Sequence, residues 1–186
     1  SAGDGNDRIW GGSGHDALNG DAGNDAISGN SGNDVFNGGT GADTAVFLSG
    51  ATVAVNLSLT TAQVTGEGTD TFVSIENVTS GAGNDTITGS SAANAIQTGD
   101  GHDLVFAGAG NDTVDGGAGN DTLDGGAGGD VLTGGTGTDT VTYASATSAV
   151  RADMTTSSGN TGFAAGDSYN SIENLIGSSY ADVLSG

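Results

Sequence analysis

The 186-residue chain contains no cysteine, no proline and no lysine, and only 5% of its residues are aromatic. Without cysteine, neither a disulfide nor a thiolate–zinc site can hold the fold together. Its only basic residues are Arg8 and Arg151, so it lacks the basic surface that binds nucleic acid or anionic membranes. It also lacks an apolar run near the ~20 residues that cross a bilayer, and a basic-then-apolar N-terminal signal. These absences exclude nucleic acid as a partner and membrane insertion.

Glycine and acidic residues are what the chain has in excess. It contains 37 glycines and 23 acidic residues, for a formal charge of −21, and its hydrophobic fraction is 34%. Ordinary domains are roughly 45–50% apolar, counting glycine, so a large conventional core is not expected. The length allows one domain or two small ones. Composition alone would indicate disorder, so the order of residues along the chain decides the fold class.

A nine-residue period runs through two segments of the chain. Its consensus is G-G-x-G-x-D-x-(apolar)-x, with one departure in the acidic position, Asn94. The apolar position two residues later is filled throughout, with Ala45 as its weakest member. Such a repeat predicts a solenoid. The acidic positions are Asp7, Asp16, Asp25, Asp34 and Asp43, then Asp85, Asp103, Asp112, Asp121, Asp130 and Asp139.

The two halves of the repeat have different physical roles. The glycine-rich half suits a tight turn with positive φ, and the x-apolar-x half suits a very short strand with one inward side chain. Two units then make one coil of about 18 residues, and successive coils stack at ~4.8 Å. Each coil buries about two apolar side chains, too few to offset the ordering of so much glycine. Another source of stability is required.

The aspartates themselves indicate that source. Carboxylates 18 residues apart lie on the same edge of neighbouring coils and would repel unless a cation lay between them. Hard oxygen ligands in a flexible loop favour Ca²⁺. This spacing predicts about seven sites, which would change the charge from −21 to −7, with an eighth pair, Asn94 and Asp112, doubtful because Asn94 has no charge. The seven pairs are Asp7–Asp25, Asp25–Asp43, Asp85–Asp103, Asp103–Asp121, Asp121–Asp139, Asp16–Asp34 and Asp112–Asp130.

The nonapeptide resembles the RTX (repeats-in-toxin, hemolysin-type) calcium-binding repeat, closely over residues 2–46 and 80–142. The resemblance implies an all-β fold, a right-handed parallel β-roll with Ca²⁺ between its coils. It also implies that carbonyls of the second and fourth loop residues join the aspartates as ligands. Asp21 and Asn30 replace the second glycine in two loops, which keeps the carbonyl but strains the turn. The implied carbonyl ligands are Gly12, Gly14, Gly39, Gly41, Gly81, Gly83, Gly99, Gly101, Gly108, Gly110, Gly117, Gly119, Gly126, Gly128, Gly135 and Gly137.

The resemblance also implies where the protein works. It implies type I secretion from a Gram-negative bacterium, and a chain that is unfolded in calcium-poor cytosol and folds on meeting extracellular calcium. The expected localisation is therefore extracellular, secreted or at the cell surface.

Two segments break the period and resemble each other. Val53–Leu57 matches Val150–Met154, Asp70 matches Asp167, and Ser-Ile-Glu-Asn occurs in both. Alternating apolar residues from Val53 to Leu59 predict a half-buried strand within a hairpin-like excursion. Each excursion returns to the nine-residue period at a glutamate, Glu76 or Glu173, which takes the position of the repeat's aspartate. We expect one continuous solenoid, with two rolls joined by a spacer as the alternative. The predicted units are a first array (1–47), an excursion (48–79), a second array (80–142), a second excursion (143–176) and the start of a further repeat (177–186).

Several other side chains could suggest a functional site. His15 and His102 fill the variable turn slot and are expected to face solvent, because no nucleophile accompanies them. Asp115 and Asp124 lie outside the ligand slot and are expected to be solvated surface charges, or loose calcium ligands at a contact. A weakly supported carbohydrate platform competes with a packing role for the aromatic residues Trp10, Phe47, Phe72, Phe106, Tyr143 and Tyr169.

We therefore expect a non-catalytic protein, since no glycosidase cleft, P-loop or metalloprotease motif occurs. The favoured function is a secreted, calcium-binding structural segment of a cell-surface, adhesin, S-layer or filament protein. The alternative is the accessory C-terminal module of a type I-secreted enzyme, such as a lipase, protease or alginate epimerase, that aids export and folding. Neither end resembles a polar capping coil, which suggests a piece of a longer protein and self-association through coil ends.

Overall fold

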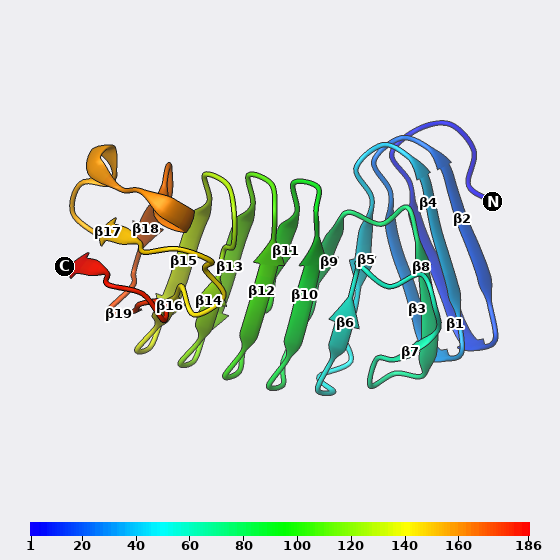
Figure 1. Ribbon diagram of the computed structural model, residues 1–186. Coiled ribbons are helices and arrows are strands. Elements are labelled where there is room, and N and C mark those ends of the chain that lie inside the picture. The colour runs from blue at the N-terminus through cyan, green and yellow to red at the C-terminus, as the bar shows by residue number, and fades with distance from the viewer.

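The computed structural model describes residues 1–186 as a stack of short strands that advances along one axis (Figure 1). One face is a single eight-stranded sheet that passes through both arrays. In spatial order its strands are β1 (Arg8–Gly14), β3 (Ala26–Gly32), β5 (Thr44–Val46), β9 (Asn77–Thr79), β11 (Ala95–Gln97), β13 (Thr113–Ala118), β15 (Val131–Thr136) and β18 (Ser168–Asn170).

The opposite face is divided into two sheets. The first holds β2 (Ala17–Ala22), β4 (Val35–Thr40), β8 (Thr69–Val73) and β7 (Gln63–Val64). The second holds β6 (Ala54–Asn56), β10 (Thr86–Ser90), β12 (Leu104–Gly108), β14 (Thr122–Asp124), β16 (Thr140–Thr142) and β19 (Asn174–Ile176). A separate pair consists of β17 (Arg151–Asp153) and β20 (Val183–Ser185).

Almost all strand pairing is parallel. Within the arrays it joins residues 18 apart, whereas the parallel pairs that span an excursion join residues 32 to 37 apart. Val114 lies opposite Leu132, and Ile87 lies opposite Val105. The strand pair β7–β8 is antiparallel. The helical segments are two single turns, η1 (Ser157–Gly159) and η2 (Gly162–Ala164), and no helix has the length and apolar character needed to span a membrane. The fold is the expected parallel β-roll.

The core is one line of apolar side chains between the two faces. Each repeat supplies one inward residue, and Ile27, Ile87, Val114 and Leu132 are wholly inaccessible to solvent. Ile9, on the first strand, is only partly buried. Only 50 of the 186 residues are buried, so the core is small, as composition predicted.

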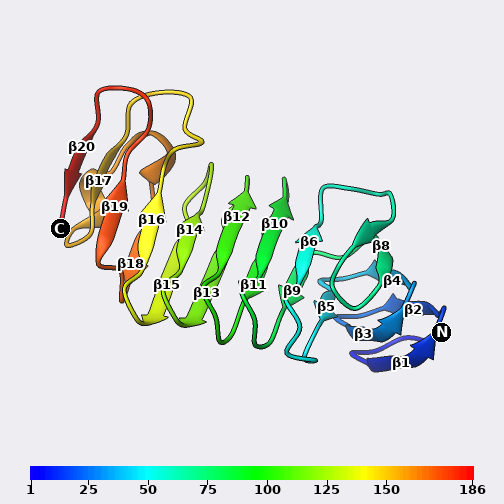
Figure 2. The same ribbon diagram turned by 90° about the horizontal axis from the view of Figure 1, so that it is seen from below.

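The first excursion places three strands, β6, β7 and β8, on one face of the roll. The chain leaves β5, forms β6 beside β10, then turns back through β7 and β8 so that β8 lies beside β4. β6 and β8 are not paired, which divides that face. Figure 2 shows the strands of the first array turned relative to those of the second at this break.

The two excursions have the same topology. Pairing joins β4 to β8 and β15 to β18, β5 to β9 and β16 to β19, and β6 to β10 and β17 to β20. The structure thus relates the excursions as the matched sequences do. Because both arrays share one sheet, the solenoid continues through the first excursion.

The predicted strand over the alternating segment is shorter than expected. Val53 and Val55 are buried, but Leu59 is 43% exposed and follows the end of β6. β6 ends at Asn56 because Asn56 bonds to Gln63 and Ser58, which turns the chain toward β7.

Candidate metal centre

The aspartates of the period form two ladders along the edges of the roll. We call each pair of aspartates 18 residues apart a rung. In each rung the backbone N–H of the first aspartate donates to Oδ1 of the second, as Asp103 does to Asp121 at 2.9 Å. The structure brings together all seven predicted pairs in this way, at 2.7–2.9 Å. The neighbouring coils therefore place consecutive carboxylates against one another.

The second oxygen of each of these carboxylates has no partner. Oδ2 is buried and accepts no hydrogen bond in the eleven residues Asp7, Asp16, Asp25, Asp34, Asp43, Asp85, Asp103, Asp112, Asp121, Asp130 and Asp139. These are the aspartates that the period predicts as ligands. A buried unpaired charge is costly unless a cation compensates it. The orphaned oxygens therefore fit a bound cation.

Burial also changes the acidity of these carboxylates. It raises the pKa of Asp121 to about 6 and that of Asp130 to about 7, and like charges on neighbouring coils add to the rise. Burial likewise raises the pKa values of Asp43, Asp85 and Asp112. The chain offers no arginine or lysine to these sites, since its only two arginines lie outside the ladders, and His102 opposes the rise at Asp121 only slightly.

The glycine turns contain two kinds of backbone carbonyl. Second-position carbonyls such as that of Gly99 accept an N–H from the next coil, in this case that of Ala118. The carbonyls of Gly101, Gly110 and Gly119 accept no hydrogen bond within the protein, and each points at the glycine one coil further on. Gly81 is the one predicted carbonyl ligand without positive φ. The others have it: Gly12, Gly14, Gly39, Gly41, Gly83, Gly99, Gly101, Gly108, Gly110, Gly117, Gly119, Gly126, Gly128, Gly135 and Gly137.

The first glycine of the repeat is needed for a different reason. A Cβ on Gly116 would lie 2.4 Å from Oδ2 of Asp121, so the carboxylate occupies the space that a side chain would fill. Asp21 and Asn30, which replace second glycines, adopt φ of 74° and 59°. This confirms the expected strained turns, because such φ values are uncommon for residues with a side chain.

The donor set is that of a hard cation. No group of three or more His, Cys, Asp or Glu side chains converges anywhere in the protein, so a rung offers two carboxylates and otherwise carbonyl oxygens. Oxygen ligands in flexible loops suit Ca²⁺ rather than Zn²⁺, which takes nitrogen and sulfur ligands. Bound there, Ca²⁺ would supply positive charge between stacked carboxylates.

Each excursion ends a ladder with a residue outside the predicted set. Oδ1 of Asp70 accepts the N–H of Asp34, and Oδ1 of Asp167 accepts the N–H of Asp130. Their second oxygens are not orphaned, because Thr65 and Tyr143 donate hydroxyl hydrogen bonds to them. A hydroxyl therefore satisfies these two buried carboxylates. Because Asp70 and Asp167 lie 36 and 37 residues from their partners rather than 18, the nine-residue period did not predict them as ladder residues. Their match to each other was visible in the sequence.

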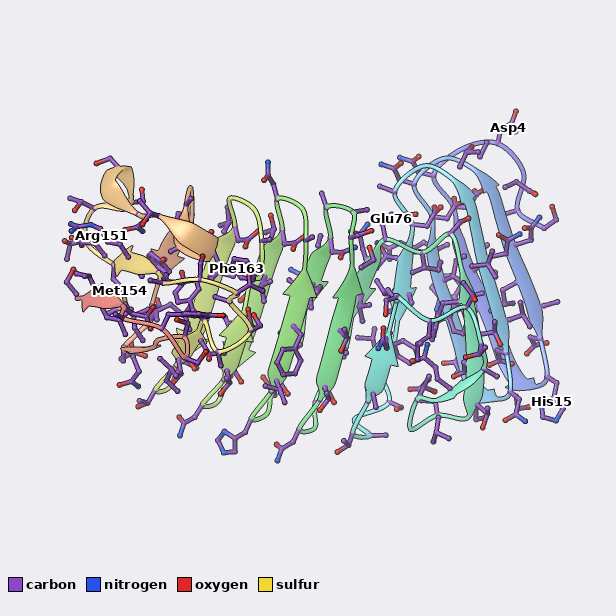
Figure 3. The ribbon with its side chains drawn as sticks, viewed as in Figure 1. Asp4, His15, Glu76, Arg151, Met154 and Phe163 are labelled. Atoms are coloured by element: carbon purple, nitrogen blue, oxygen red, sulfur yellow. The ribbon has the colours of Figure 1, made fainter.

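The two glutamates occupy the slot predicted for them. Oε2 of Glu76 accepts the N–H of Asp43, and Oε2 of Glu173 accepts that of Asp139. Figure 3 shows Glu76 where the first excursion rejoins the roll. The doubtful rung differs, because Nδ2 of Asn94 donates to the carbonyl of Glu76 and its Oδ1 accepts the N–H of Ser90. Both ends of the Asn94 side-chain amide are therefore engaged by the protein, unlike the orphaned carboxylate oxygens of the other rungs.

Asp124 is not the solvated surface charge that was expected. It is 2% exposed, and neither of its carboxylate oxygens has a hydrogen-bond partner. The second excursion covers it, with Ser145 and Phe163 lining the same pocket. Asp115 is partly buried.

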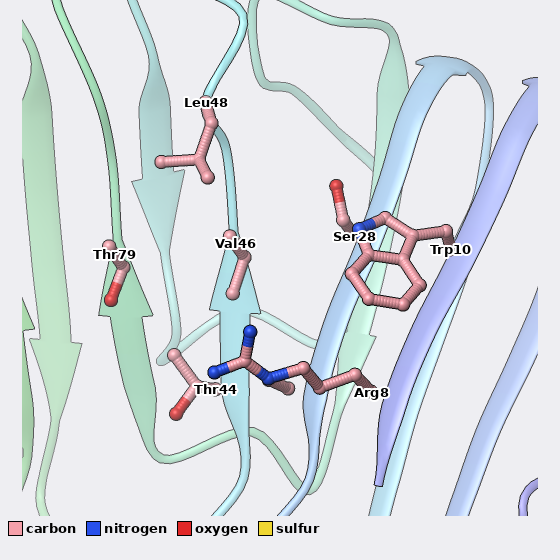
Figure 4. A pocket seen from close by; sticks show the side chains of 8 residues that line it. Arg8, Trp10, Ser28, Thr44, Val46, Leu48 and Thr79 are labelled. Atoms are coloured by element: carbon pink, nitrogen blue, oxygen red, sulfur yellow. The ribbon is translucent and has the colours of Figure 1, made fainter.

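The histidines face solvent as expected, and three of the aromatic residues pack in the core. His15 and His102 are exposed, and their Nδ1 atoms accept the N–H groups of Asn33 and Asn120. Phe47, Phe72 and Tyr143 are buried and unavailable as a carbohydrate platform. Trp10 is 66% exposed beside Arg8, in a pocket of about 370 Å³ on the eight-stranded sheet (Figure 4).

Comparison with known families agrees with this geometry. A sequence model of the RTX calcium-binding nonapeptide repeat matches the chain in four copies, at residues 1–27, 10–45, 79–114 and 106–141. Together these segments span more than half of the chain. A search of curated proteins finds no matching relative. The chain therefore belongs to the RTX calcium-binding repeat family, and its glycine turns form a calcium-binding repeat module.

Proposed function

We propose that the chain is a secreted, non-catalytic structural segment that folds when it binds extracellular Ca²⁺. The observation that supports this most strongly is the set of eleven buried, unpartnered Oδ2 atoms. A metal-free roll leaves these charges uncompensated over a small core. Cation binding then supplies folding free energy, as in other metal-dependent domains.

The proposed ligands are the eleven aspartates and the second- and fourth-position turn carbonyls. With two carboxylates per site, they provide for about seven ions. The proposed sites coincide with seven rungs, in each of which an N–H···Oδ1 bond holds the carboxylate of the later aspartate against the preceding coil. Extracellular modules bind Ca²⁺ with Kd of ~10⁻⁴–10⁻³ M, so the calcium difference across a cell envelope would operate the switch.

The setting we propose is the outside of a bacterial cell, within a surface, adhesin or filament protein. Repetition of the excursions and continuity of one sheet through both arrays support a role in which the stacked structure itself is the function. The accessory module of a secreted enzyme is the competing assignment.

Sedimentation velocity of the full chain tests this proposal. In chelator we expect a slow, expanded particle, and in millimolar calcium a compact one. Growth into large species with calcium would favour the assembly role, and a compact monomer would favour the accessory module. A sedimentation coefficient that does not respond to calcium would refute the proposed folding switch.

Asp121→Asn tests the ligand assignment. Asp121 belongs to two rungs, through Asp103 and Asp139. Losing one carboxylate from two sites should weaken calcium-dependent folding about tenfold or more. The matched control is Asp115→Asn, on the neighbouring strand and outside the rungs. Equal calcium midpoints for the two variants, measured by circular dichroism, would refute the assignment.

A further inference from the structure

Asp124 is the one orphaned carboxylate outside the glycine turns. It is the last residue of β14, and it lies opposite Phe106 of β12 on the outward side of the sheet. Strand residues in this position normally face solvent, but Asp124 is 2% exposed. Both of its oxygens lack a partner, whereas each ladder aspartate lacks only one.

The second excursion covers Asp124. A pocket of about 180 Å³ separates the excursion from the roll, lined by Phe106, Gly108, Asp124, Gly126, Ser145 and Phe163. Figure 3 shows Phe163 on the excursion, where it approaches the strands of the second array. The volume is ample for one ion with water molecules, since water occupies about 30 Å³. The two aromatic side chains give part of the pocket an apolar wall, which lowers the local dielectric and strengthens electrostatic attraction at Asp124.

No protein group compensates the charge. The hydroxyl of Ser145 and the N–H groups of Gly126 and Ser145 face the carboxylate, but none makes a full hydrogen bond to it. Neither arginine lines the pocket. Protonation would remove the charge but would leave a buried O–H and C=O unpaired, which costs about 1–3 kcal/mol. A hard cation satisfies both oxygens at once.

We propose that Asp124 forms a further site for a divalent cation of the calcium type, separate from the ladders. The two carboxylate oxygens and the Ser145 hydroxyl are its protein ligands, and water completes the coordination. Asp124 belongs to β14 and Ser145 to the second excursion, so an ion bound to both would stabilise the packing of the excursion against the roll. This site goes beyond the proposed folding switch, since it stabilises a docked segment rather than stacked turns.

Calcium stoichiometry tests the site. Equilibrium dialysis of the full chain with Ca²⁺ should show one ion fewer per chain for Asp124→Asn than for the wild type. Asp115→Asn, one repeat earlier in the same position, should bind as the wild type does. An unchanged stoichiometry for Asp124→Asn would overturn the site, as would the loss of several ions. A wild type that binds no calcium would instead refute the proposed function.

Trypsin tests the link to the excursion. The chain contains only two cleavage sites, Arg8 in β1 and Arg151 in the excursion. In saturating calcium, Asp124→Asn should raise the cleavage rate at Arg151 about tenfold, because local opening exposes it. Cleavage at Arg8 should not change. Equal rates at Arg151 in the variant and the wild type would overturn the link.

A second variant covers the case in which Asp124→Asn does not fold. Ser145 is exposed, so Ser145→Ala should leave the fold intact. We expect it to weaken one calcium site several-fold, through the lost hydroxyl ligand. A binding isotherm identical to that of the wild type would then overturn the proposal.

Discussion

At the scale of single residues, the glycines of the turns meet two separate demands. Gly119 has φ of +136°, which a side chain rarely adopts, and a Cβ there would lie 1.4 Å from the carbonyl oxygen of Gly101. Gly14 has φ of +134° but no atom within 4 Å of its Cβ position. Backbone strain is therefore common to both glycines, whereas close stacking constrains only Gly119.

Alanine substitutions at these two glycines should separate strain from stacking. Gly14→Ala should lose about 1–3 kcal/mol, because its φ lies in a range that residues with a side chain rarely adopt. Gly119→Ala should lose at least about 2 kcal/mol more, because its Cβ would in addition push apart two neighbouring coils. Urea unfolding in saturating calcium measures both. Losses of equal size would show that stacking does not constrain Gly119.

At the scale of elements, each excursion satisfies its own buried carboxylate with a hydroxyl group. The hydroxyl of Tyr143 donates to Oδ2 of buried Asp167 at 2.7 Å, and Thr65 does the same for Asp70. The position that closes each array on that edge is thus satisfied within the protein. Asp34 and Asp130 reach these closing rungs through the same N–H···Oδ1 bond as elsewhere.

Tyr143→Phe should leave Asp167 with a buried unpaired oxygen. We expect a loss of about 1–3 kcal/mol in the free energy of unfolding. Tyr180→Phe is the control, because Tyr180 is half exposed and its hydroxyl makes no hydrogen bond to Asp167. Chemical unfolding in calcium compares the two variants. A variant at Tyr143 as stable as the one at Tyr180 would exclude this role for the hydroxyl.

At the scale of the whole molecule, many carboxylates respond together to pH. Burial, aided by neighbouring carboxylates, raises the pKa of Asp130 to about 7 and that of Asp121 to about 6, against ~3.9 in an unfolded chain. The folded chain therefore holds protons that the unfolded chain has released. By linkage, the metal-free fold loses stability as the pH rises through this range.

Lowering the pH should partly replace calcium. In calcium-free buffer we expect more strand signal at pH 5 than at pH 8, because protonation removes buried charge. Calcium affinity should change in the opposite direction, rising with pH as protons cease to compete for the carboxylates. Circular dichroism and calcium titrations at both pH values measure these trends. Metal-free stability that increases with pH would contradict the burial of these groups.

Excursion contacts could not be predicted from spacing. Asp70 and Asp167 join the ladders over 36 and 37 residues, and the N–H of Val53 donates to Asp85 over 32. The lengths of the excursions, rather than the nine-residue period, set these separations along the sequence. The sequence did reveal that the two excursions correspond, but not which strand each would lie beside.

The sequence by itself determined the parallel roll and the positions of its ladder aspartates. A repeat of constant length places each residue beside its counterpart one coil away, so contacts follow from counting. Only the tertiary structure decided the environment of Asp124, because the excursion that covers it lies outside the period. It also decided that Thr65 and Tyr143 satisfy carboxylates, since a hydroxyl hydrogen bond depends on where a folded segment comes to rest.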